Sequence, residues 1–190
     1  MVRSVALKFV NFMKLRKTSK EEFVSSITTD KADSFAKTFV AKANMQDQWD
    51  LCVGAWEGNQ LLGAIITTVS KRSPRVANLQ LLHTFSAHRG KGVGRILCED
   101  SLSKVMNEAQ YFRVSAEPDA VAFYEKLGFK FLGKQKSGCQ LSMFRVNGSS
   151  FFDGEYDIED PVIYNAVHRK GKGGCVEVFV EARGLSGFFE

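Results

Sequence analysis

The residues with the clearest chemical potential lie in the turn from His88 to Gly94, which reads His-Arg-Gly-Lys-Gly-Val-Gly. The segment before it, residues 79–85, is rich in apolar residues and predicts a mostly buried strand. After it, apolar residues recur at helical spacing as far as Val105. A strand, a glycine-rich turn and a helix N-terminus in this order can bind an anion with backbone groups alone. Glycines let the main chain approach a phosphate, and the first N–H groups of the helix have no partner inside it.

Two well-known phosphate-binding patterns do not fit this turn. The dinucleotide fingerprint G-x-G-x-x-G would need a third glycine at Leu97. A P-loop would need Lys-Ser or Lys-Thr after its last glycine, where this sequence has Arg95 and Ile96. The turn from His88 to Gly94 therefore predicts a phosphate-binding site of another kind, which we call the cradle and which includes the helix N-terminus after the turn.

Through Arg89, Gly92 and Gly94 the turn resembles the Q/R-x-x-G-x-G/A signature of the GNAT family of acyl-CoA N-acyltransferases. A second segment, residues 120–129, reads AVAFYEKLGF and is similar to that family's A-x-x-F-Y-x-x-x-G-F signature. The two motifs are independent of each other and stand in the family's order and separation. The resemblance covers residues 51–145 and implies an α/β fold (an α+β mixed sheet) of the GNAT type, followed by a C-terminal extension.

The resemblance implies that acetyl-CoA is the acyl donor and that the glycine turn holds its pyrophosphate, with added charge from Arg89 and Lys91. It also implies backbone contacts from Thr84 and Phe85 to the pantetheine arm, with an N–H near them polarising the thioester carbonyl. No metal is implied. The expected cofactor-binding residues are Thr84, Phe85, Arg89, Gly90, Lys91, Gly92, Val93, Gly94 and Arg95.

Three residues are the candidates for proton transfer. Tyr124 matches the family's tyrosine at the step in which the departing thiolate gains a proton, and the alternative is that it only packs in the core. His83, on the central strand, is the expected base for the amine by type and placement, although a lone histidine on a strand is also a common structural residue. Glu117 and Glu57 are the carboxylate rivals, and Glu57 also suits a turn.

Glu117 departs from the family's pattern. It stands where the family often has an asparagine that contacts the pantetheine arm. A carboxylate cannot donate a hydrogen bond as an amide does. Either the contact to the pantetheine differs here, or Glu117 serves the acceptor.

The N-terminal part of the chain predicts one strand and two helices. The strand covers Val5 to Phe12 and is followed by a basic loop. Thr18 or Ser19, with an acidic residue three positions on, predicts a helix cap. In the helix that follows, the residues expected to face the core are Phe23, Val24 and Ile27. The second helix covers residues 33–43, and residues 45–49 are expected to form a loop or a helix end.

The middle of the chain predicts a hairpin and a short helix. Residues 51–56 and 61–69 are β-rich and flank the four-residue turn 57–60. Pro118 and Gly128 bracket the helix that carries Tyr124. Further strands are expected at residues 111–115, 129–133 and 139–146, the last two as an antiparallel pair.

We expect two parts in the chain, a catalytic domain over residues 1–147 and an extension over residues 148–190. Within the extension, residues 162–164 and 176–180 could form strands. The extension could be a lid, a substrate-binding addition or the arm of a homodimer. No mechanism attaches to it.

Composition restricts the class of protein. A chain of 190 residues that is 44% apolar suits one domain, or one domain with an appendage. No apolar run approaches the ~20 residues of a membrane span, and the N-terminus lacks a signal-peptide core. The four cysteines are far apart, so they indicate neither a zinc site nor a disulfide framework. Cys52, Cys98 and Cys139 are most simply reduced core thiols, and we expect a cytoplasmic protein with no membrane partner.

A net charge of +5 has two interpretations. It can be solvated surface, or it can attract the phosphates of CoA or of a nucleic acid. Basic residues gather near the start of the chain, at Lys8, Lys14, Arg16, Lys17 and Lys20, and near its end, at His168, Arg169, Lys170 and Lys172.

The sequence therefore predicts an enzyme that moves an acetyl group from acetyl-CoA to an amine by direct attack. Two alternatives stay open: an enzyme that modifies an amine of a DNA or RNA base, and a binding module without catalysis. The intact turn from Arg89 to Gly94 argues against the binding module, because such a module has no need for a phosphate cradle. The fold does not choose the acceptor.

Overall fold

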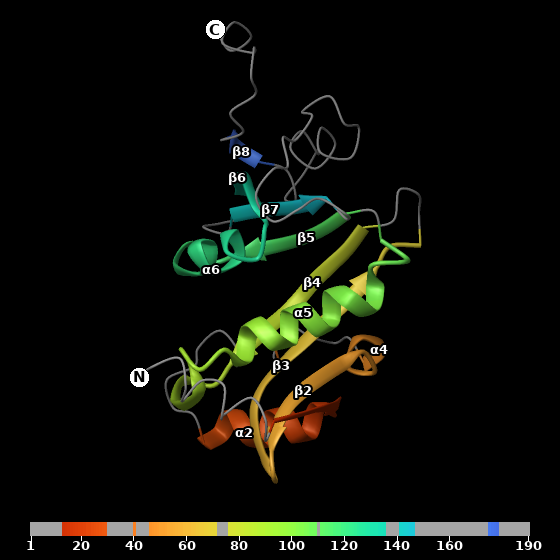
Figure 1. Ribbon diagram of the computed structural model, residues 1–190, viewed down its shortest axis with the longest axis vertical. Helices are drawn as coiled ribbons and strands as arrows, with labels where there is room; N and C mark the ends of the chain where they lie inside the picture. Colours follow the sequence, from red (N-terminus) through yellow and green to blue (C-terminus); the bar gives the residue numbers. More distant parts are fainter. Residues whose placement is uncertain are drawn as a thin grey trace, which may run out of the picture. The chain divides into compact units, whose positions relative to one another are not determined.

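The computed structural model describes residues 13–29, 40, 46–71, 76–109, 111–135, 141–146 and 175–178 (Figure 1). The chain forms two compact units. One comprises residues 1–68 and 79–106, and the other comprises residues 69–78 and 107–190. The first unit contains the glycine turn, and the second contains the helix that carries Tyr124.

The described part of the first unit is organised on strands that follow one another in the order β1-β2-β3-β4. These are β1 (Lys14–Lys17), β2 (Cys52–Glu57), β3 (Gln60–Val69) and β4 (Val76–Thr84). Both β1 and β3 pair with β2 in the antiparallel sense. Beyond the end of β4, the N–H of Phe85 donates to the carbonyl oxygen of Leu62 over 3.0 Å, which continues an antiparallel β3-β4 hairpin.

Residues 14–17 form a strand where the sequence predicts a basic loop, so that prediction was wrong. The strand pairs along its length with β2, from Lys14 opposite Trp56 to Lys17 opposite Val53. Its side chains are largely exposed, so it lacks the alternation of apolar and polar residues that identifies a strand from sequence. Charged residues on such a strand also discourage pairing with other chains.

The predicted β2-β3 hairpin is confirmed, with a tighter turn than expected. Glu57 and Gln60 pair with each other as the last residues of the two strands, and only Gly58 and Asn59 form the loop. Gly58 has φ 57°, a conformation that a two-residue hairpin loop often requires.

Helix α2 (Lys20–Thr29) begins with the predicted cap. The N–H of Ser19 donates to Glu22 Oε2 over 2.8 Å, and the N–H of Glu22 donates to Ser19 Oγ over 3.2 Å. This reciprocal pair is a capping box. As predicted, Phe23 and Ile27 are buried in the core, whereas Val24 is only half-buried.

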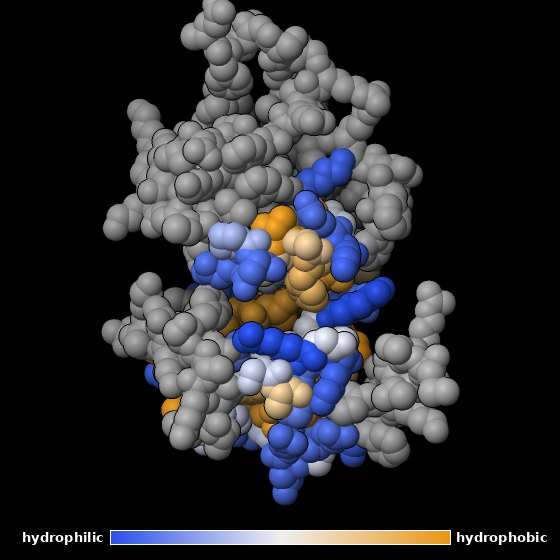
Figure 2. Space-filling view, turned by 90° about the vertical axis from the view of Figure 1, so that its left-hand side faces the viewer, coloured by the Kyte–Doolittle hydropathy of each residue, from blue (hydrophilic) through white to orange (hydrophobic). Residues whose placement is uncertain are grey.

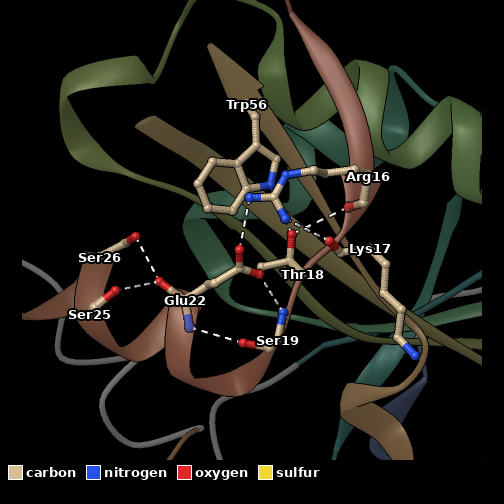
Figure 3. A network of polar contacts seen from close by, with 8 residues as sticks. All are labelled: Arg16, Lys17, Thr18, Ser19, Glu22, Ser25, Ser26 and Trp56. Atoms are coloured by element: carbon tan, nitrogen blue, oxygen red, sulfur yellow. Dashed lines mark hydrogen bonds and ion pairs between the residues drawn. The ribbon is translucent and has the colours of Figure 1, made fainter. Parts of the chain in front are cut away.

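A polar network joins the start of α2 to β1 and β2 (Figure 3). The Arg16 guanidinium carbon lies 3.8 Å from the centroid of the Trp56 ring, and Arg16 Nη2 is 2.8 Å from Glu22 Oε1. Trp56 Nε1 in turn donates to Thr18 Oγ1 over 2.9 Å. Gly54 leaves room for this bond, because a Cβ there would lie 2.7 Å from Trp56 Nε1.

Helices α2 and α5 (Val93–Val105) cover opposite faces of β3. Ala64 and Ile66 belong to the same buried cluster as Phe23 of α2. Thr67, which alternation places on the other face, accepts a hydrogen bond over 2.6 Å from Ser101 of α5. The predicted helix after the glycine turn is confirmed as α5, and Ser101, in its third turn, bonds it to the sheet.

The described strands of the second unit follow the order β5-β7-β6-β8, and each adjacent pair is antiparallel. The elements are β5 (Tyr111–Ala116), the 3₁₀ helix η2 (Pro118–Ala120), α6 (Val121–Glu125), β6 (Lys130–Gln135), β7 (Leu141–Val146) and β8 (Cys175–Val178). The predicted antiparallel pair is confirmed as β6 and β7. The expected strand over residues 176–180 is present as β8, which adds to the sheet beside β6.

Several predictions fall outside the described residues. They are the strand over residues 5–12, most of the helix over residues 33–43, and the strand over residues 162–164. Within the second of these ranges, Val40 is described and lies against the core of the first unit. Residues 46–49, expected as a loop or helix end, form the short helix α4 (Gln46–Trp49). None of the described helices is long and apolar enough to cross a membrane.

Two cysteines of the first unit are buried thiols, as predicted. Cys52 and Cys98 are both free and both buried. Burial, together with a smaller contribution from the negative charge of Glu22, raises the pKa of the Cys52 thiol to about 12. The Cys52 thiol therefore stays protonated and inert at neutral pH.

Candidate active site

The glycine turn connects the end of β4 to the first turn of α5 through the 3₁₀ helix η1 (Ser86–His88). Gly90 has φ 75° and Gly92 has φ 84°, a region in which other residues incur about 1–2 kcal/mol of strain. A Cβ at either position would meet no atom within 4 Å. The backbone conformation is therefore what requires glycine, and the space beside the turn is open to a ligand.

The N-terminus of α5 suits an anion. Gly92 is its N-cap and supplies no side-chain hydrogen bond to the first turn. The N–H groups of Val93 and Gly94 therefore lie at an end of the helix dipole that favours negative charge. Figure 2 views the molecule from the side of this helix end. On the described part of that face, hydrophilic side chains predominate and hydrophobic ones form patches.

The three basic residues of the turn are placed differently. Arg89 Nε donates to the carbonyl oxygen of Thr84 over 3.1 Å, which fixes the guanidinium beside the end of β4. Lys91 is exposed in the turn. Arg95 is directed along α5, where its Nε lies 2.7 Å from Glu99 Oε1. Arg89 and Lys91 are therefore better placed than Arg95 to add charge to the cradle.

The backbone N–H groups of Thr84 and Phe85 point to opposite edges of β4. The N–H of Phe85 is bonded to Leu62 on β3. Because backbone groups of successive strand residues point to opposite edges, the N–H of Thr84 points away from β3. The bond from Arg89 to the Thr84 carbonyl agrees with this direction. Of the two predicted backbone donors, Thr84 can offer its N–H to a thioester carbonyl, whereas that of Phe85 is already engaged.

Gly63, in β3, contributes to the cradle, although it was not among the predicted site residues. A Cβ at Gly63 would lie 2.6 Å from the carbonyl oxygen of His83 and 3.2 Å from Val93 Cγ1. Gly63 thus lets the first turn of α5 sit close to the hairpin. The signal available in the sequence was a glycine inside a strand, which often marks a close approach of backbone.

His83 lies in the core of the first unit, with a residue exposure of 4%. Its ring centroid is 5.0 Å from that of Phe85 and 6.0 Å from that of Phe23, and both contacts are edge-on. This packing suits the structural alternative raised from the sequence. The role of His83 as the base stays a prediction.

A pocket of about 730 Å³ lies in the first unit, between α2, the β2-β3 turn and η1. The residues that line it are Ser25, Ser26, Glu57, Asn59, Gln60, Leu61, Phe85, Ser86, Ala87 and His88. Glu57, one of the predicted carboxylate candidates, is among them. His88 is 8% exposed, and its Nε2 lies 3.2 Å from Gln60 Nε2. His88 was predicted only as part of the glycine turn, and Gln60 and the two serines were not predicted as site residues, because nothing in the sequence links three elements so far apart.

Tyr124 and Glu117 belong to the second unit. The Tyr124 ring is buried, with its centroid 5.1 Å from that of Phe123 and 5.7 Å from that of Phe129. Glu117 precedes η2, and its carbonyl oxygen accepts a hydrogen bond from the N–H of Ala120 over 2.9 Å. The roles of Tyr124 as general acid and of Glu117 as a rival base stay predictions.

Comparison with known families identifies the class of protein. Residues 17–146 match the model of the acetyltransferase (GNAT) domain. The chain therefore belongs to the GNAT acetyltransferase family, which confirms the predicted family and fold class. It is an acyl-CoA-dependent N-acyltransferase, an acetyltransferase that uses CoA as the acyl carrier.

Individual relatives agree with this assignment. The chain is 29% identical over 111 residues to the N-alpha-acetyltransferase RimI of Mycobacterium tuberculosis (strain ATCC 25618 / H37Rv), covering 57% of this chain and 67% of that protein. It resembles the PaiA N-acetyltransferase of Thermoplasma acidophilum in complex with coenzyme A, at a TM-score of 0.56, 15% identity, and coverage of 70% of this chain and 98% of that one. It also resembles the ribosomal-protein-S18-alanine N-acetyltransferase of Escherichia coli, at a TM-score of 0.55, 16% identity, and coverage of 76% and 99%. At 15% and 16% identity, the likeness of this chain to these two structures shows a common fold and nothing more.

Proposed function

We propose that this acetyltransferase transfers an acetyl group from acetyl-CoA to the α-amino group of a peptide or protein N-terminus. The observation that carries the proposal is the similarity to an N-alpha-acetyltransferase over 111 residues, a stretch long enough to include both a donor site and an acceptor site. The amine attacks the thioester directly, so no acyl group is held by the chain.

The cradle and the edge of β4 supply the donor site. The first N–H groups of α5 hold the pyrophosphate, and Arg89 adds charge from its fixed position beside Thr84. The N–H of Thr84 hydrogen-bonds the thioester carbonyl. This bond strengthens as negative charge grows on the oxygen during attack, and that difference lowers the barrier.

The proton balance requires one acid and one base. As the C–N bond forms and the C–S bond breaks, the amine gives up one proton and the departing thiolate gains one. Tyr124 donates the proton to the thiolate. His83 takes the amine's proton directly or through water, with Glu117 as the carboxylate alternative.

A panel of acceptors tests the proposal with one donor, acetyl-CoA labelled in its acetyl group. It contains a peptide with a free N-terminus and no lysine, the same peptide with a blocked N-terminus and one lysine, a small diamine, and single-stranded DNA and RNA. We expect label on the first peptide at the highest rate. Faster labelling of any other member would replace the proposed acceptor class with that one.

Two of the three described basic residues of β1 are ion-paired, which weakens the case for the nucleic-acid alternative. Arg16 is ion-paired with Glu22 over 2.8 Å, and Lys17 lies 3.3 Å from Asp50. These pairs offset part of the positive charge that a phosphate backbone would need.

A further inference from the structure

The pocket between α2, the β2-β3 turn and η1 has a clear chemical character. Most of its lining side chains can hydrogen-bond: two serines of α2, the Asn59 and Gln60 amides, Ser86 and His88. Leu61 and Phe85 add apolar surface. Among the described residues that line the pocket, Glu57 supplies the one carboxylate, and none is a lysine or an arginine. Such a pocket suits a polar or positively charged group and disfavours an anion.

The position of the pocket relates it to the donor site within the same unit. Phe85 and η1 form one wall, and Phe85 directly follows Thr84, whose N–H we assign to the thioester carbonyl. Adjacent α-carbons are about 3.8 Å apart. The wall therefore begins one residue along the chain from Thr84, within reach of the first side chains of an acceptor whose amine attacks the carbonyl bound there.

The lining is also partly preorganised. The His88 side chain is buried, and its Nε2 lies 3.2 Å from Nε2 of the Gln60 amide. Gln60 and Glu57 pair with each other at the end of the β2-β3 hairpin, which fixes the backbone on which the carboxylate stands. A site built on strand ends and packed side chains holds its geometry better than a mobile loop does.

We propose that this pocket binds the first side chains of the acceptor peptide and that Glu57 makes the enzyme select basic over acidic N-termini. The inference rests on the proposed function, because it takes the acceptor to be a peptide. The Glu57 carboxylate attracts a lysine or arginine side chain and repels an aspartate or glutamate. The surrounding hydroxyl and amide groups complete the hydrogen bonds of whichever polar group enters.

Two peptides that differ only in their first two residues, Lys-Lys or Glu-Glu, test the proposal on the full-length protein. We expect wild-type enzyme to favour the basic peptide in kcat/KM, and Glu57→Gln to reduce that preference about five- to tenfold through KM, as loss of one charge-assisted contact predicts. Glu21→Gln is the matched control. Glu21 is an exposed carboxylate of α2 outside the pocket, so this variant should keep the wild-type preference.

A second variant obstructs the pocket without touching the core. Ala87 is exposed on η1 and lines the pocket, so Ala87→Trp should raise KM for both peptides and leave the affinity for acetyl-CoA unchanged. Equal peptide preference and equal KM in wild type, Glu57→Gln and Ala87→Trp would overturn the pocket proposal while leaving peptide acetylation intact.

Calorimetric binding of the same peptides to the CoA-bound protein separates the two proposals. Binding of the basic peptide that weakens in Glu57→Gln, without any acetyl transfer, would support the pocket and refute the proposed function. If neither peptide binds or reacts, the pocket does not serve a peptide and the inference is wrong.

Discussion

Arg89 Nε donates a hydrogen bond of 3.1 Å to the carbonyl oxygen of Thr84, so a side chain of the glycine turn is bonded to the end of β4, the strand before the turn. This bond does two things. It holds the guanidinium where a pyrophosphate at the N-terminus of α5 can reach it. It also occupies the Thr84 carbonyl and leaves the N–H of that residue as the group directed to a ligand.

The first prediction concerns this contact. Arg89→Ala should weaken acetyl-CoA binding about ten- to a hundredfold, because it removes a charged hydrogen-bond donor and loosens the end of β4. Arg89→Lys should recover only part of that loss, because a lysine keeps the charge but not the planar donor that reaches Thr84. Calorimetric titration with acetyl-CoA measures both variants. Lys104→Ala, on the exposed side of α5, is the control and should bind normally. Normal affinity in Arg89→Ala would remove Arg89 from the cradle.

The second prediction concerns the backbone of the turn. Gly92→Val should abolish detectable acetyl-CoA binding, because φ 84° is unfavourable for a branched residue and the N-terminus of α5 must move. The variant should remain folded, since a Cβ at Gly92 meets no atom within 4 Å. Circular dichroism checks the fold and calorimetry checks the affinity. A folded Gly92→Val protein that binds acetyl-CoA as well as wild type does would refute the anion site.

The third prediction concerns the proton donor. Tyr124→Phe keeps the ring and its contacts with Phe123 and Phe129 and removes only the hydroxyl. Turnover should fall about 10²–10⁴-fold, the usual contribution of one general acid, with little change in acetyl-CoA affinity. Steady-state kinetics and calorimetry together measure the two effects. A parallel loss of affinity and turnover would instead assign Tyr124 to cofactor positioning.

The fourth prediction concerns stability and pH. The hydrogen bond from Arg16, with a further one from the backbone of Ser19, lowers the pKa of Glu22 below its ordinary value of 4.5. Because the folded state favours the carboxylate, the stability that Glu22 adds is present above pH 4.5 and is lost as pH falls through the lowered pKa. Glu22→Gln should therefore reduce the free energy of unfolding at pH 7 by about 0.5–1 kcal/mol, a small effect because the Glu22 side chain is 35% exposed.

Urea unfolding at pH 7 and at pH 3 measures this difference. The gap between wild type and Glu22→Gln should shrink at the lower pH. Glu21→Gln, one residue earlier in the same helix turn, controls for the helix dipole and should show a smaller gap at pH 7. A gap for Glu22→Gln that stays constant between the two pH values would contradict the role assigned to its charge.

The elements around the donor site could be predicted because their signals are local. The glycines of the turn lie within a few residues of one another. The same holds for successive apolar residues after Val93 and for the capping pair of Ser19 and Glu22. The strand at residues 14–17 could not be recognised in this way. Its backbone is held by β2, and its exposed charged side chains carry no strand pattern.

The acceptor side was harder to predict because it depends on contacts between distant segments. Glu57 stood out only as a carboxylate in a turn, and His88 only as a neighbour of the cradle. Folding brings both to one pocket with the serines of α2. His83 is a further example: its residue type predicts a base, a role that stays a prediction, but the sequence does not display its edge-on packing against Phe23 and Phe85.

The position of the transferred acetyl group shows whether the α-amine of a peptide is the acceptor. A peptide with both a free α-amine and one internal lysine is incubated with the enzyme and acetyl-CoA labelled in its acetyl group, and tandem mass spectrometry identifies the acetylated nitrogen. We expect label on the α-nitrogen, at a rate that falls with Arg89→Ala. Label on the lysine alone, or no enzyme-dependent label on the peptide, would contradict it.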